Sequence, residues 1–227
     1  MPNRVQLETA RLRDRLENGD PLWPVQAAVA ATIGLHLTLS AQVVVGPRWL
    51  VPSIEGVLLV VLVVIAPARA TARSLRVRRF TLFVIGFVTL TTVVSLVLLV
   101  HFLINGGRTG GHSLILSGIA LWATNVLIFA AWYWEMDRGG PVVRFEHRDA
   151  MPDFQFPQME NPKFAPDGWM PGFLDYFYTS LTNSTAFSPT DTMPLTPTAK
   201  ILMGIQGVAA LVTVGLVVAR AVNILGG

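Results

Sequence analysis

A run of hydroxyl and amide side chains near the C-terminal end holds the residues best suited to chemistry. Hydroxyl and carbonyl oxygens at membrane depth can replace the water shell of an ion. Three prolines, Pro189, Pro194 and Pro197, interrupt or follow this run, which favours irregular backbone. We therefore take the range 182–191, with Gln206 beyond it, as a candidate ion path. The candidate residues are Thr182, Asn183, Ser184, Thr185, Ser188, Thr190, Asp191 and Gln206.

The composition surrounding this run is that of a membrane protein. Of the 227 residues, 52% are hydrophobic and 14% are charged, and the mean hydropathy is +0.53. Soluble domains usually carry about 25% charged residues, so a multi-pass membrane protein is expected. The chain has no cysteine, which excludes disulfides and thiol chemistry.

Five apolar stretches are long enough to cross a bilayer, which takes about 20 helical residues. Between the last two stretches lies an aromatic segment, Gly172–Asn183, that is too short to cross. The predicted fold is therefore all-α: five transmembrane helices plus a short re-entrant or interfacial helix before the last span. The predicted spans are Leu22–Gly46, Leu50–Ala68, Phe80–Ile104, Ser113–Trp134 and Thr198–Leu225.

The chain divides into four predicted parts. Residues 1–21 form an N-terminal amphipathic segment without the apolar core of a secretory signal. A four-helix transmembrane region covers 22–134, and a surface loop covers 135–171. The last part, 172–227, holds the pore-loop-like helix, the polar stretch and the final span.

Arginines predict the orientation, because cytoplasmic loops carry an excess of Lys and Arg. The N-terminal segment, the 69–79 loop and the 135–171 loop hold most of these residues, and five crossings put all three on one side. We expect a cytoplasmic N-terminus. The 69–79 arginines either only set this topology or also bind anionic lipid headgroups. They are Arg69, Arg73, Arg76, Arg78 and Arg79.

The polar stretch resembles the pore region of tetrameric potassium channels, "TTVGYGD…P…K", with matches at Thr185, Asp191, Pro194 and Lys200. The resemblance implies a pore loop before an inner helix. Ser188 and Thr190 replace both filter glycines, and Pro189 replaces the tyrosine. Glycine tolerates the filter backbone cheaply and proline removes an N–H, so a filter of the potassium type is not expected. The loop charges place the loop on the cytoplasmic side, as in the inverted pores of glutamate receptors.

The chain as a whole resembles a family of uncharacterised bacterial multi-pass inner-membrane proteins. Two motifs carry the likeness, Asp153-Phe154-Gln155-Phe156-Pro157 and Asp175-Tyr176-Phe177-Tyr178. The resemblance implies a location in the inner membrane and this order of spans, and it implies no chemistry.

Polar residues inside the predicted spans are costly, which makes them functional candidates. His36 either bonds a neighbouring helix or relays protons, and Glu55 is expected at the interface near Arg48. Asn125 and Gln206 are expected to bond between helices, with Gln206 alternatively facing a cavity. Three glycines of the last span are expected to permit close helix packing or a bend. They are Gly204, Gly207 and Gly215.

No enzyme motif is present, and no cofactor or metal is expected. The loop residues Asp137, Glu146, His147 and Asp149 form either a loose cation site or a solvated loop, and the solvated loop is favoured.

The sequence thus leaves two functional hypotheses. The first is an oligomeric pore-loop ion channel, and the alternative is a non-conducting membrane scaffold or accessory subunit. An axial cavity at the polar stretch favours the first, and hydroxyls that all bond within one chain favour the second. The expected partners are the lipid bilayer and, for a channel, further copies of the chain, with no nucleic acid.

Overall fold

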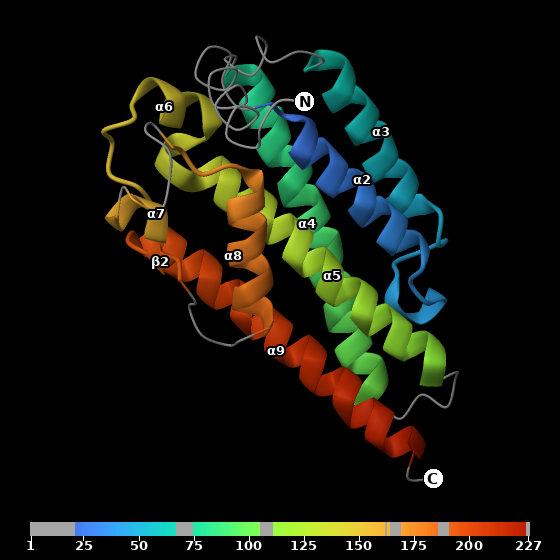
Figure 1. Ribbon diagram of the computed structural model, residues 1–227. Helices are drawn as coiled ribbons and strands as arrows, with labels where there is room; N and C mark the ends of the chain where they lie inside the picture. The colour runs from blue at the N-terminus through green and yellow to red at the C-terminus, as the bar shows by residue number, and fades with distance from the viewer. Residues whose placement is uncertain are drawn as a thin grey trace, which may run out of the picture.

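The computed structural model describes residues 21–66, 75–104, 111–161, 163, 169–185 and 191–225, which are mostly helical (Figure 1). Ten of its elements are helical and two are short strands. The longer helices are α2 (Trp23–Leu37), α3 (Leu50–Ile65), α4 (Leu75–Ile104), α5 (Gly111–Met136), α8 (Phe173–Thr185) and α9 (Pro197–Leu225). The shorter elements are η1 (Ala41–Val43), η3 (Asp137–Gly139), α6 (Pro141–Glu146), β1 (Phe154–Gln155), α7 (Pro157–Glu160) and β2 (Met193–Pro194). The predicted N-terminal segment lies almost wholly outside the described residues.

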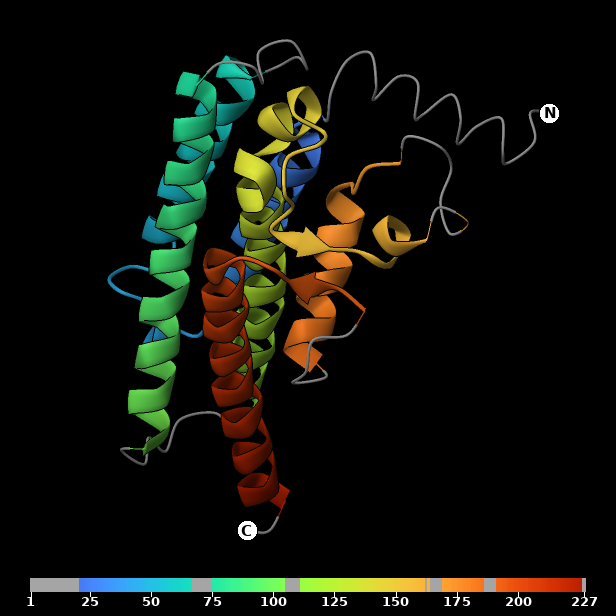
Figure 2. The ribbon, with the colours of Figure 1, turned by 90° about the vertical axis from the view of Figure 1, so that its left-hand side faces the viewer.

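Three helices within the described ranges are long and apolar enough to cross a membrane, namely α4, α5 and α9. At 1.5 Å per residue, α4 with 30 residues spans about 45 Å, more than the ~30 Å of a bilayer core. Figure 2 shows α4, α5 and α9 running along the long axis of the molecule. The third, fourth and fifth predicted spans are therefore confirmed as candidate membrane helices.

The first two predicted spans are shorter than expected. A helix over Leu22–Gly46 is wrong in its second half, because α2 ends at Leu37. The backbone beyond it finds partners outside a helix: the Ser40 N–H donates to Ser117 Oγ at 2.9 Å, and Arg48 Nε donates to the Leu39 carbonyl at 3.1 Å. With 15 and 16 residues, α2 and α3 span about 22 and 24 Å. Both lengths are below the ~30 Å of a bilayer core, so the length of neither helix shows that it crosses the membrane.

Helix α5 is the centre of the bundle and packs against α2, α4, α8 and α9. Its side chains Ala131, Tyr133 and Trp134 are at most 1% exposed and join the main apolar core. The neighbouring helices expose apolar faces instead, as expected of helices in contact with lipid. These faces include Phe83, Leu90, Val93 and Val97 on α4 and Ile201, Ile205, Val208 and Leu211 on α9.

The chain reverses directly after α5 and folds back as an ordered cap. Arg138, Gly139 and Gly140 have φ angles of 52°, 78° and 99°, the left-handed region that suits glycine. In α6, Arg144 is fully buried, and its Nη1 donates to the Trp134 carbonyl at 3.0 Å. The predicted surface loop therefore contributes a buried cation to the fold.

Asp137 anchors this cap to the bundle. Its Oδ1 accepts the Asp153 N–H at 2.8 Å, and its Oδ2 accepts the Tyr176 hydroxyl at 2.5 Å. Arg144 Nη1 lies 3.8 Å from the same Oδ2. Asp153 in turn accepts the Thr196 hydroxyl at 2.5 Å, beside the antiparallel pair β1–β2. Asp153 and Tyr176, one from each of the two quoted motifs, thus meet at Asp137.

The favoured solvated loop fits the other three members of the loose acidic cluster. Glu146, His147 and Asp149 are exposed, whereas Asp137 is buried apart from them in the cap contacts. Within the described residues, no group of three or more His, Cys, Asp or Glu side chains could hold a metal ion.

The expected packing role of three α9 glycines is wrong within the chain. A Cβ added at Gly204, Gly207 or Gly215 would meet no atom within 4 Å. The close approach lies instead on α5, where a Cβ at Gly118 would stand 2.3 Å from Val217 Cγ2. Gly118 is therefore the residue that lets α5 and α9 touch.

We predict that Gly118→Ala lowers the free energy of unfolding by about 1–3 kcal/mol, because stiff Val217 must move to admit the methyl group. Chemical unfolding in detergent micelles, followed by tryptophan fluorescence, measures the change. Adding Val217→Ala should recover part of the loss. Gly204→Ala is the matched control and should be neutral or stabilising by up to about 1 kcal/mol. Equal stability of the two single variants would contradict the contact.

Candidate functional site

Helix α8 carries most of the predicted ion-path residues and lies beside α5 and α9 (Figure 1). It begins after Gly172, whose N–H donates to Asp175 Oδ2 at 2.6 Å, and it ends at Thr185. The short helix predicted over Gly172–Asn183 is confirmed. Its outer face exposes Leu174 and Tyr178, while four of its hydroxyl and amide side chains face inward. The buried polar residues are Thr179, Ser180, Asn183 and Ser184.

Gln206 on α9 is the centre of these inward contacts and is fully buried. Its Nε2 lies 2.6 Å from Ser180 Oγ, 2.8 Å from Ser184 Oγ and 3.0 Å from the Ser180 carbonyl. Its Oε1 accepts hydrogen bonds from Asn183 Nδ2 at 3.0 Å and from the Tyr133 hydroxyl. A carboxamide has two N–H donors and two acceptor lone pairs, so all of its capacity is used. We call Tyr133, Ser180, Asn183, Ser184 and Gln206 the Gln206 cluster.

Backbone carbonyls complete the Gln206 cluster. Ser180 Oγ donates to the Val126 carbonyl at 2.7 Å, and Asn183 Nδ2 donates to the Met203 carbonyl at 3.0 Å. From α5, Asn125 Nδ2 donates to the Gln206 carbonyl at 3.3 Å. The expectation that Asn125 and Gln206 bond between helices is confirmed, and the cluster ties α5, α8 and α9 together.

The structure does not gather all eight candidate residues. It brings together Asn183, Ser184 and Gln206. Thr182 is half-buried, with its hydroxyl 2.9 Å from the Tyr178 carbonyl, and the Thr185 hydroxyl donates to the Leu181 carbonyl at 3.0 Å. Thr185 and Asp191 are exposed. Ser188 and Thr190 lie outside the described residues.

Sequence reasoning missed the role of Tyr133 in this cluster, and it gave Ser180 no special weight. The signal for Ser180 was present: positions 179, 180, 183 and 184 share one face of an α-helix whose other residues are largely aromatic. Tyr133 had no such signal, because it falls within the aromatic run "WYW" that is typical of a membrane interface.

A second buried polar cluster joins α2, α3 and α4. His36 Nδ1 lies 3.0 Å from both carboxylate oxygens of Glu55, and the exposed fractions of these two residues are 3% and 0%. The expected position of Glu55 at the interface near Arg48 is wrong, because Glu55 is buried against His36 and Thr91. The expected helix-to-helix hydrogen bond of His36 is confirmed.

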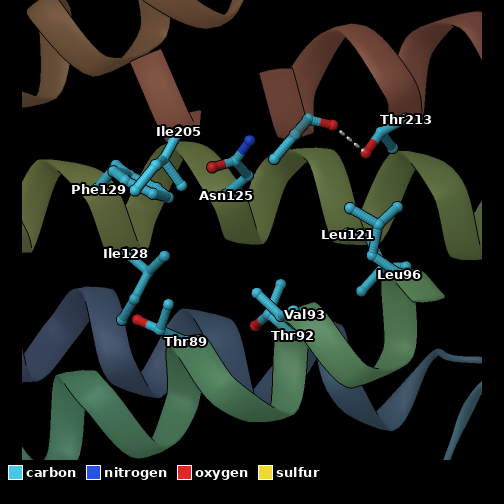
Figure 3. Close-up of a pocket in the computed structure, with 11 residues that line it drawn as sticks. Thr89, Thr92, Val93, Leu96, Leu121, Asn125, Ile128, Phe129, Ile205 and Thr213 are labelled. Carbon is cyan, nitrogen blue, oxygen red and sulfur yellow. Dashed lines mark hydrogen bonds between the residues drawn. The ribbon is translucent and has the colours of Figure 1, made fainter. Parts of the chain in front are cut away.

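A small pocket of about 50 Å³ lies between α4, α5 and α9. Figure 3 shows Asn125 of α5 on one side and Thr89 and Thr92 of α4 across the pocket, among mostly apolar side chains. Among the residues that the structure describes, none forms a hydrogen bond with the Asn125 Oδ1 atom. The volume suits one or a few water molecules, which the amide oxygen could bind.

No family model matches this chain, and no curated protein or solved structure gives a significant match to it.

We predict that Gln206→Leu lowers the free energy of unfolding by about 2–3 kcal/mol. The variant keeps the volume but removes the partner of several buried groups, and each orphaned group costs about 1–3 kcal/mol at most. Model membrane helices give smaller values of about 0.6–2 kcal/mol per hydrogen bond. Unfolding by denaturant in detergent micelles measures the loss.

Gln42→Leu is the matched control, because Gln42 is an exposed glutamine in η1. Such surface substitutions usually change stability by less than about 0.5 kcal/mol. Similar losses in both variants would show that the Gln206 cluster adds nothing specific to stability.

Proposed function

We propose that the chain is a non-conducting integral membrane protein, acting as a scaffold or accessory subunit, in which α8 packs as an internal helix. The observation that supports this most directly is the saturation of the Gln206 carboxamide by groups of the same chain. The three long apolar helices suggest a membrane location. The proposal includes five membrane crossings of the chain, with the N-terminus in the cytoplasm.

An ion path needs oxygen atoms that face water along a continuous route. The oxygens of Ser180, Asn183 and Ser184 face α5 and α9 instead, and all three residues are at most 8% exposed. To bind an ion, these groups would first have to leave their present partners, at a cost of about 1–3 kcal/mol for each group left unpaired. The geometry therefore favours packing over conduction for this part of α8.

The pore-loop channel remains the competing hypothesis, with Thr185 and Asp191 as its best-placed residues. Both are exposed at the C-terminal end of α8 and the start of the segment that follows residues 186–190. A pore built from them needs several copies of the chain, because one short loop cannot enclose a path. This arrangement would agree with the likeness to potassium-channel pore regions. The second resemblance, to uncharacterised inner-membrane proteins, assigns no chemistry and favours neither hypothesis.

The proposed contact with anionic lipid is best carried by Arg76 and Arg79, which are exposed at the start of α4. Arg78 is partly engaged elsewhere, because its Nε lies 3.8 Å from Glu135 Oε2. Arg69 and Arg73 lie outside the described residues. The proposed lipid site thus rests on the two exposed arginines of this turn.

We predict no unitary current from the purified protein in planar bilayers, with a known channel reconstituted in parallel as the positive control. The internal bonding of the Gln206 cluster is the reason. Thr185→Ala, Ser188→Trp and Asp191→Asn variants are recorded under the same conditions. Currents of the unaltered protein that Ser188→Trp blocks or Asp191→Asn alters would overturn the proposal in favour of the channel.

Single-cysteine labelling tests the five crossings, because the chain has no native cysteine. A membrane-impermeant thiol reagent applied to intact cells should label Ala41→Cys, between α2 and α3, and should not label Met151→Cys in the cap. Both positions are exposed. Permeabilised cells should label both. Protection of Ala41→Cys in intact cells would mean that α2 and α3 do not cross the membrane.

A further inference from the structure

His36, the histidine of the His36–Glu55 pair, lies at the wall of a cavity of about 160 Å³ between α2, α3 and α4. His36, Thr91 and Ser95 supply the polar part of its lining, and the remainder is apolar. Val45, in the segment between α2 and α3, also lines the cavity and is 57% exposed, so the cavity reaches the molecular surface at that segment. Its volume is enough for several water molecules.

The hydrogen bonds determine where the protons of His36 lie. Thr92 Oγ1 is 2.7 Å from the Val88 carbonyl, which can only accept, so this bond uses the one hydroxyl proton of Thr92. Thr92 Oγ1 is also 3.3 Å from His36 Nε2. A proton on Nε2, donated to Thr92, satisfies both contacts at once, so the geometry favours a protonated Nε2.

One further proton then lies between His36 Nδ1 and Glu55. Nδ1 is 3.0 Å from each carboxylate oxygen, and two acceptors without a proton would repel at this distance. The proton sits either on Nδ1, giving an imidazolium–carboxylate pair, or on Glu55. In both cases the resting pair has no net charge, the state that its burial among apolar helices favours.

Thr91 provides a hydrogen bond for more than one protonation state of Glu55. Its Oγ1 is 2.9 Å from Glu55 Oε1 and also 2.9 Å from the Val88 carbonyl, but it has a single proton. With Glu55 as a carboxylate, Thr91 can donate to it. With Glu55 protonated at Oε1, Thr91 can accept from it and donate to Val88. Because Thr91 also lines the cavity, it connects Glu55 with that space.

We propose that His36 and Glu55 form a buried proton-binding site, loaded from the cavity beside Thr91. At rest the pair shares one proton across Nδ1 and the carboxylate. A second proton, delivered by a hydronium ion that leaves as water, binds the pair, so that Glu55 carries a proton on Oε1 and His36 carries a proton on each ring nitrogen. Only O–H bonds change, and the charge of the pair rises from zero to +1.

The other charged and titratable groups on the packed elements lie away from the pair along their helices. On α4, Arg79 and His101 are 12 and 10 residues from Thr91, or about 18 and 15 Å along the axis. Arg48, between α2 and α3, donates to the Leu39 carbonyl. On α2 and α3 themselves, His36 and Glu55 are the only titratable side chains. The groups on the remaining packed positions are Arg76 and Arg78 on α4 and His112 and Glu135 on α5.

Infrared pH-difference spectra of the full chain in lipid vesicles test the proposal. Acidification should produce a carboxylic-acid carbonyl band that is lost in Glu55→Gln and kept in Glu146→Gln, a control at an exposed position. In Thr91→Val the band should move to higher wavenumber, because the acid loses its hydroxyl partner, whereas Thr91→Ser should keep the original position. A purely structural pair would show no band that depends on Glu55, and that result would overturn the proposal.

Two further measurements apply to protein with the pair intact. A variant with His101→Gln, His112→Gln and His147→Gln leaves His36 as the sole histidine, and ¹⁵N spectra should show its Nε2 protonated across the titration. An unprotonated Nε2 would contradict the inferred hydrogen bonds. Val45→Cys should react with a water-soluble thiol reagent at least about tenfold faster than Leu62→Cys, a position buried on α3. Equal rates would rule out loading through the cavity.

Discussion

The arrangement of the bundle depends on the need to satisfy the buried carboxamide of Gln206. Its nitrogen and oxygen both lie among apolar helices, where an unpaired polar group costs several kcal/mol. On α8, Ser180 and Ser184 bond the carboxamide nitrogen and Asn183 bonds the oxygen. Helix α8 must therefore present its polar face to α9. This inverts the usual pattern of a surface helix and explains why Leu174 and Tyr178 point outward.

The same constraint acts at two other places in the molecule. His36 and Glu55 satisfy each other where α2, α3 and α4 meet, and Asp137 joins Arg144 and Tyr176 where the cap meets α5. At these three places in the described part of the chain, an apolar contact surface is therefore combined with a set of matched polar groups. Because lipid offers helices no hydrophobic drive to associate, such polar contacts and close packing at Gly118 specify which helices pair.

The long helices could be predicted from the sequence, because length and apolar composition alone determine α4, α5 and α9. The short helix α8 was also predictable, but its orientation was not, since that depends on Gln206 being its neighbour. The break after Leu37 carries no proline, and its backbone is satisfied by Ser117, 77 residues away. The His36–Glu55 contact was missed for a similar reason: which of several apolar helices pack together is not readable from a single sequence.

The density of hydroxyl groups around α8 therefore has a physical cause that needs no ion. Thr and Ser side chains are short enough to bond across closely packed helices, and α8 places them where α5 and α9 converge. The groups that remain open to a solute are elsewhere: the cavity of about 160 Å³ reaches His36 and Thr91 from the surface. Burying a carboxyl group that shares its proton with an imidazole costs free energy, and such groups are common at functional sites. The space between α2, α3 and α4 is therefore a better candidate for a functional site than α8.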